Sequence, residues 1–132
     1  MKKPSYHFLR VGLAITFLWI GILIFQNPEA WGSYIKPWAL AWLPLSLVQV
    51  MVGTAVLDIT VGVLLLLDIF TWIAAFVGAM HIIVVLVTSG ITDITVRDVG
   101  LLTGALAISF EALPEWILSK FKKKEMVPLT NN

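Results

Sequence analysis

Long apolar stretches alternate with short polar segments along the chain, and this alternation is the dominant pattern of the sequence. A helix needs about 20 apolar residues to cross a hydrocarbon core of about 30 Å, whereas an isolated strand leaves backbone groups unpaired in lipid. The last stretch, Val99 to Leu113, is short, and we extend it to the interfacial anchor Trp116. The pattern predicts an all-α integral membrane protein, a four-helix transmembrane bundle with spans at about 8–26, 45–67, 72–88 and 97–116.

The connections between these runs differ in kind. Residues 68–71 alone separate the second run from the third, which predicts a tight antiparallel helical hairpin. Residues 27–44 are aromatic and interrupted by prolines, so we expect an interfacial segment between the first and second spans, carrying Trp31, Tyr34, Trp38 and Trp42. No repeat or linker divides the chain, which indicates a single domain, 1–132.

Lysine and arginine are concentrated at the two ends of the chain. The side that holds both termini carries most of them, against only Lys36 and Arg97 on the other side. The positive-inside rule then places both termini in the cytoplasm, with 117–132 as a basic cytoplasmic tail of a multi-pass cell membrane protein. The first run is too long for a cleaved signal peptide, so we interpret it as a retained span. The lack of a basic surface argues against a nucleic-acid partner.

Composition limits the chemistry. The chain is 59% hydrophobic and 13% charged, which identifies the lipid bilayer as its surroundings. It has no cysteine, which excludes disulfides, thiolate metal sites and covalently attached haem. His7 lies at the membrane edge and His81 inside it, so the two cannot ligate one haem. No nucleotide, hydrolase or zinc motif is present. We expect no metal or haem, and any redox chemistry would use a borrowed cofactor.

Asp58 lies near the centre of the second span, where an acid costs about 3 kcal/mol to insert. It shares one helix face with Thr54 and Gly62, and this face is expected to turn inward. His81 lies as far after the hairpin turn as Asp58 lies before it, so the two should share a depth. This arrangement has two interpretations. Asp58 and His81 form a site for a proton or a quinone, or they form a polar core that only stabilises the bundle.

Further charges lie where the spans meet the interfaces. Arg10 and Asp68 fall at the same edge of the bundle and can pair there, or Arg10 can simply reach the interface. Arg97 and Asp98 open the fourth span at the opposite edge. This second pair can anchor the orientation of the helix or hold an anionic headgroup or ligand.

Several short segments form a recognisable series through all four predicted spans: Leu9 to Gly12, Phe17 to Gly21, Leu57 to Leu67, Thr71 to Ala75 and Arg97 to Leu102. Together they resemble the DoxX family of small membrane proteins. The resemblance implies a four-helix membrane protein, in a family named after a membrane subunit linked to thiosulfate:quinone oxidoreductase. Other relatives are associated with oxidative-stress proteins. Asp58 stands where the family often has Glu, and the Trp-rich segment looks like a subgroup feature.

The leading hypothesis is a quinone-interacting membrane subunit of a redox complex, in which Asp58 and His81 handle protons and a protein partner handles electrons. Such a chain would be a subunit rather than a stand-alone catalyst. One alternative is a non-catalytic anchor or assembly protein that recruits a cytoplasmic partner through Lys120 to Lys124 and Glu125. Another is a small transporter built by homo-oligomerisation, with Asp58 lining a shared pathway. The sequence leaves the quinone and the oligomeric state open.

Overall fold

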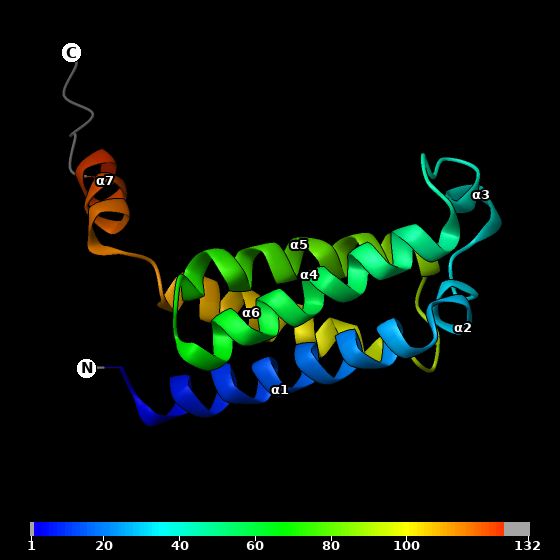
Figure 1. Cartoon of the computed structure of the whole chain (residues 1–132). Helices are drawn as coiled ribbons and strands as arrows, with labels where there is room; N and C mark the ends of the chain where they lie inside the picture. The colour runs from blue at the N-terminus through cyan, green and yellow to red at the C-terminus, as the bar shows by residue number, and fades with distance from the viewer. Residues whose placement is uncertain (1, 126–132) are drawn as a thin grey trace, which may run out of the picture.

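The apolar runs fold as helices that begin and end close to the predicted positions. The computed structural model describes residues 2–125, and these contain helices and no strand (Figure 1). The helices are α1 (Pro4–Gln26), α2 (Pro28–Gly32), α3 (Pro37–Leu40), α4 (Leu47–Leu67), α5 (Thr71–Ser89), α6 (Val96–Glu111) and α7 (Glu115–Glu125). Of these, α1, α4 and α5 are each long and apolar enough to cross a membrane. The predicted all-α membrane fold is confirmed.

The fourth span differs from the prediction. Helix α6 ends at Glu111, and the following helix α7 is bent away from it by 83°, so the stretch predicted as one span through Trp116 is divided between two helices. Pro114 explains the break, because proline has no backbone N–H and disfavours helical conformation at the residue before it. The pair α6 and α7 counts as a fourth span only if the bent pair is taken together. Of the predicted tail 117–132, residues 117–125 belong to α7 and 126–132 lie outside the described residues.

The two ends of the bundle are built differently. The N-terminus of α1, the turn between α4 and α5, and α7 lie at one end, which we call the N-terminal end (Figure 1). Helices α2 and α3 lie at the other, which we call the α2–α3 end. Both helices belong to the Trp-rich segment, residues 27–44, in which Trp38 and Trp42 are exposed. The interfacial position of this segment stays a prediction.

Close backbone contact joins α1 to α4. A Cβ atom added at Gly62 would lie 2.8 Å from the Leu18 nitrogen and 3.0 Å from the Ala14 carbonyl oxygen. One added at Gly21 would lie 3.0 Å from the Ala55 carbonyl oxygen. Small residues allow this approach, as is common between membrane helices. α5 packs along α6 in a second pair, while α4 and α5 contact each other more sparsely.

Candidate functional site

Asp58 and His81 face each other across the hairpin of α4 and α5. The Asp58 Oδ1 atom lies 3.5 Å from His81 Nε2, and the side chains are 5% and 15% exposed, respectively. This separation exceeds that of an ordinary N–H···O hydrogen bond. Among the described residues, Asp58 Oδ1 has no hydrogen-bond partner. A buried carboxyl oxygen with an unfilled bonding position thus lies beside an imidazole nitrogen.

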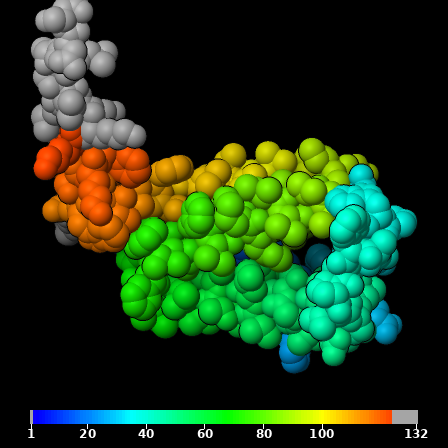
Figure 2. Space-filling view, turned by 90° about the horizontal axis from the view of Figure 1, so that it is seen from above, coloured from blue at the N-terminus to red at the C-terminus, as the bar shows by residue number. Residues whose placement is uncertain are grey.

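A cavity of about 100 Å³ adjoins this pair. Its apolar lining includes Phe17, Ile20, Ile24 and Trp31, and its polar lining includes Thr16, Tyr34, Thr54 and Ser89. Figure 2 looks onto α4 and α5 and shows the surface hollowed between these helices and the α2–α3 segment. The cavity therefore combines an apolar wall with a few hydrogen-bonding groups, which is the composition typical of a small-molecule site.

Regular helix spacing brings residues of α4 and α5 to this cavity. Thr54 lies one turn before Asp58, and both line it. Gly62, one turn further on, is instead packed against α1. One part of the predicted inward face therefore lines the cavity, and the other part contacts α1. On α5, His81 and Ser89 are two turns apart and both line the cavity. The spacing of Ser89 from His81 was a usable sequence signal, because residues two turns apart share a face.

Arg97 and Asp98 line the same cavity from the first turn of α6. Arg97 is exposed, and its Nε donates to the Ile94 carbonyl oxygen at 3.0 Å. Asp98 is partly buried. The sequence analysis predicted that Arg97 and Asp98 lie where the fourth span meets the membrane interface. The structure shows in addition that they line the same cavity as Asp58 and His81.

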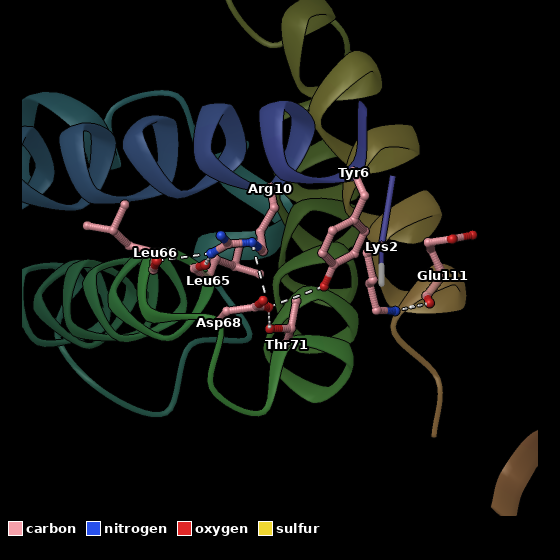
Figure 3. A network of polar contacts seen from close by, with 8 residues as sticks. All are labelled: Lys2, Tyr6, Arg10, Leu65, Leu66, Asp68, Thr71 and Glu111. Carbon is pink, nitrogen blue, oxygen red and sulfur yellow. Dashed lines mark hydrogen bonds and ion pairs between the residues drawn. The ribbon is translucent and has the colours of Figure 1, made fainter. Parts of the chain in front are cut away.

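Arg10 occupies the opposite end of the bundle (Figure 3). Its Nη1 donates to the carbonyl oxygens of Leu65 and Leu66, the latter at 2.9 Å, and its Nε lies 3.6 Å from Asp68 Oδ1. The last carbonyls of a helix have no intrahelical partner and carry its negative dipole end. Arg10 of α1 thus caps the carboxyl end of α4.

Asp68 joins three elements at this end. Its Oδ1 accepts hydrogen bonds from Thr71 Oγ1 at 2.6 Å and from Tyr6 Oη at 3.3 Å. The Thr71 bond is the main reason that the pKa of Asp68 lies below its usual range, and Arg10 lowers this pKa further. Nearby, Lys2 Nζ donates to the Glu111 carbonyl oxygen at the end of α6 (Figure 3). These contacts tie helix ends together and border no part of the cavity beside Asp58.

The fold and the buried polar pair define a multi-pass α-helical membrane protein. The family model of DoxX matches residues 5–93, from α1 to the loop after α5. This range is more than half of the chain, so the chain belongs to the DoxX family. Asp58 and His81 lie within the matched range, whereas Arg97 and Asp98 lie beyond it. Searches of the curated proteins and of the solved structures found no match.

Proposed function

We propose that this DoxX-family protein is a membrane subunit of a redox complex and binds the headgroup of a quinone, or of a similar amphipathic molecule, beside Asp58 and His81. The observation that carries the proposal is the unpartnered Asp58 oxygen at a cavity it shares with His81. Ionisable groups inside membrane bundles commonly mark ligand or proton sites. The aromatic and aliphatic wall suits a flat apolar ring.

The chemistry assigned to the chain is proton exchange and orientation. A quinone carbonyl oxygen accepts a hydrogen bond, and it takes up a proton when the quinone is reduced. Protonated Asp58 donates from its carboxyl group and His81 donates from Nε2–H, so both can serve one carbonyl oxygen that lies beside the pair, within hydrogen-bond distance of both atoms. A protein partner supplies the electrons.

We also propose a membrane orientation. Lys2 and Lys3 precede α1, and exposed lysines of α7 lie at the same end of the bundle (Figure 1). Lys36 and Arg97 lie toward the α2–α3 end. The excess of basic residues at the N-terminal end favours the cytoplasm for that end and for both termini.

Quinone binding is tested with the purified protein in lipid nanodiscs. Decyl-ubiquinone is titrated and the quenching of tryptophan fluorescence is followed, because Trp31 lines the cavity. Asp58→Asn replaces the carboxylic acid donor with a weaker amide donor and is expected to weaken binding by up to about tenfold, the net worth of one neutral hydrogen bond. Asp68→Asn is the matched control, since Asp68 lies at the opposite end, and it should bind like the wild type. Equal affinities for the wild type and Asp58→Asn would contradict the proposal.

A second candidate function is a membrane anchor that recruits a cytoplasmic partner. It is favoured by α7, which projects away from the bundle and exposes Lys120, Lys122 and Lys123 (Figure 1). Affinity purification from the native membrane should then recover a partner with the full chain and lose it when residues from Glu115 onward are removed. Quinone binding should survive that truncation, because the cavity includes no residue of α7. Recovery of the same proteins with both chains would rule out this role for α7.

A further inference from the structure

The cavity occupies one half of the bundle only. The residues of α4 that line it are Thr54 and Asp58, and no residue of α4 beyond Asp58, near the centre of that helix, does so. Those of α5 begin at His81 and continue to Ser89, the last residue of the helix. The cavity therefore reaches from the depth of the Asp58 and His81 pair toward the α2–α3 end, where Arg97 and Asp98 complete its lining.

The interior of the half beyond the pair is filled. Two grooves between α1 and α6 lie in this half, and both open toward the outside of the bundle. One of them shares Thr16 and Leu101 with the cavity and has a mostly apolar lining. Val61, Leu65, Ala75 and Ile108 belong to the buried core cluster of the interior, and both Leu65 and Ile108 are less than 2% exposed. At the end of this half, the Arg10 guanidinium covers the last carbonyls of α4 (Figure 3). A close-packed apolar interior leaves no room for a chain of water molecules.

The half of the bundle that contains the cavity can hold water. One water molecule needs roughly 10–15 Å³ of cavity volume and two to four polar partners. At about 100 Å³ the cavity has room for several, and hydroxyl groups of Thr54, Ser89 and Tyr34 line it. The Asp58 Oδ1 atom at its inner end lacks a partner among the described residues, which a water molecule would supply.

We propose that the cavity is a water-filled half-channel, through which the Asp58 and His81 pair exchanges protons with the α2–α3 side of the membrane and not with the N-terminal side. The ligands of this path are water and the proton. The titratable and charged groups that share the cavity with Asp58 are His81 from α5, Tyr34 from the segment after α2, and Arg97 and Asp98 from α6, while α1 contributes Thr16 but no charged group. The existence of this proton path does not depend on the proposed quinone binding. Only the role of the transferred proton rests on the proposed function.

Cysteine accessibility tests the path, because the chain has no cysteine of its own. Ser89→Cys and Thr54→Cys place a thiol at two depths of the cavity. Ser109→Cys is the matched control, since Ser109 is as buried as Ser89 but lies near the N-terminal end and donates to the Trp72 carbonyl oxygen. Ser33→Cys, exposed at the α2–α3 end, identifies the side from which a reagent arrives. A membrane-impermeant cationic methanethiosulfonate is added to one face of cells or oriented vesicles.

The reagent reacts with the thiolate, which forms in water and not in apolar surroundings. Added on the side that labels Ser33→Cys, it is expected to label both cavity cysteines at least about tenfold faster than Ser109→Cys. Added on the other side, it should leave the cavity cysteines unlabelled. Labelling of Thr54→Cys at the rate of Ser109→Cys, or from the N-terminal side, would overturn the inference.

The labelling experiment adds no quinone and measures only the access of water, so its outcome can differ from that of the binding experiment. Quinone binding without labelling of Thr54→Cys overturns the half-channel and leaves the binding site, which the ligand would then enter from lipid. Labelling without quinone binding supports the half-channel and removes the proposed ligand.

Discussion

Among the described residues, the ionisable side chains of Arg10 and Asp58 are both buried, at different depths, and their surroundings differ. Arg10 Nη1 donates to the carbonyl oxygens of Leu65 and Leu66. Its Nε has no hydrogen-bond partner among the described residues and lies 3.6 Å from Asp68 Oδ1. Asp58 lies at the inner end of the cavity, 3.5 Å from His81, and its Oδ1 has no hydrogen-bond partner among the described residues. Arg10 therefore has its compensation inside the protein, whereas Asp58 depends on something that enters the cavity.

This difference separates a stabilising role from a ligand-binding role. A charge with fixed protein partners contributes to stability, and its removal leaves those partners unsatisfied. An acid without a partner costs stability and is retained for another reason. Substitutions at the two places should thus have opposite effects on the free energy of unfolding.

The largest effect is expected for Arg10→Leu. It removes the donor to the α4 carbonyls and the cation beside Asp68, at a cost of about 3 kcal/mol. Thermal unfolding of the detergent-solubilised protein measures the loss. Arg97→Leu is the control, because exposed Arg97 donates only to the carbonyl oxygen of Ile94, three residues earlier, and its shift should stay within about 0.5 kcal/mol. Equal shifts for the two variants would show that the Arg10 cap contributes nothing specific.

The next largest effect is expected for Gly62→Ala. The added methyl group would meet backbone atoms of Leu18 and Ala14 at 2.8 and 3.0 Å, which cannot move aside as a side chain does. Overpacking of this kind costs about 1–3 kcal/mol. Gly53→Ala in the same helix has no atom within 4 Å of the added carbon and should be neutral or stabilising. If both variants unfold at the wild-type temperature, then α1 and α4 are not held at the described distance.

Asp58→Leu is expected to change stability in the other direction. It removes an unpartnered buried oxygen, which should raise the free energy of unfolding by about 1 kcal/mol. Asp68→Leu should lower it, since Thr71 and Tyr6 lose their acceptor. Both are measured by thermal unfolding, with decyl-ubiquinone binding as a second readout. If Asp58→Leu is instead destabilised, Asp58 stabilises the fold as Arg10 does, and the two residues do not differ in role.

The smallest effect concerns pH. The pKa of Asp68 is lowered in the folded protein, mainly by the Thr71 hydrogen bond. The resulting stability is fully present above the unfolded pKa, about 3.9, and is lost as the pH falls through the lower folded value. Asp68 is largely exposed, so solvent screening keeps this contribution below about 1 kcal/mol. Unfolding midpoints of the wild type and Thr71→Val, compared between about pH 6 and pH 3, should converge at the acidic end. Parallel curves would refute the assignment.

The sequence predicts the parts of this fold that hydropathy controls. The runs that became α1, α4 and α5 were found within a few residues of their ends, because each is a single uninterrupted apolar stretch. The short turn between α4 and α5 also indicated a shared depth for Asp58 and His81. Their rotation toward each other was not predictable, because it depends on where α1 packs, and Gly21 and Gly62 determine that contact.

Two features escaped the sequence analysis for physical reasons. The bend after Glu111 was missed because Trp116 suggested an interfacial continuation of the span, whereas Pro114 already marked the helix end. Trp31 and Tyr34 were assigned only to the interface, although both also line the cavity. Their inward position depends on the path of an irregular segment, which no periodic pattern describes.

The bend at Pro114 has a mechanical consequence. Because α7 meets α6 at 83°, it lies close to the membrane plane whenever α6 runs along the membrane normal. Tilting the bundle would then push one end of α7 toward hydrocarbon and lift the other into water. Trp116 and Phe121 are exposed on this helix, and such aromatic side chains favour the depth of the headgroups. With α7 at that depth, a helix that lies outside the bundle would restrain the tilt of the bundle in the bilayer.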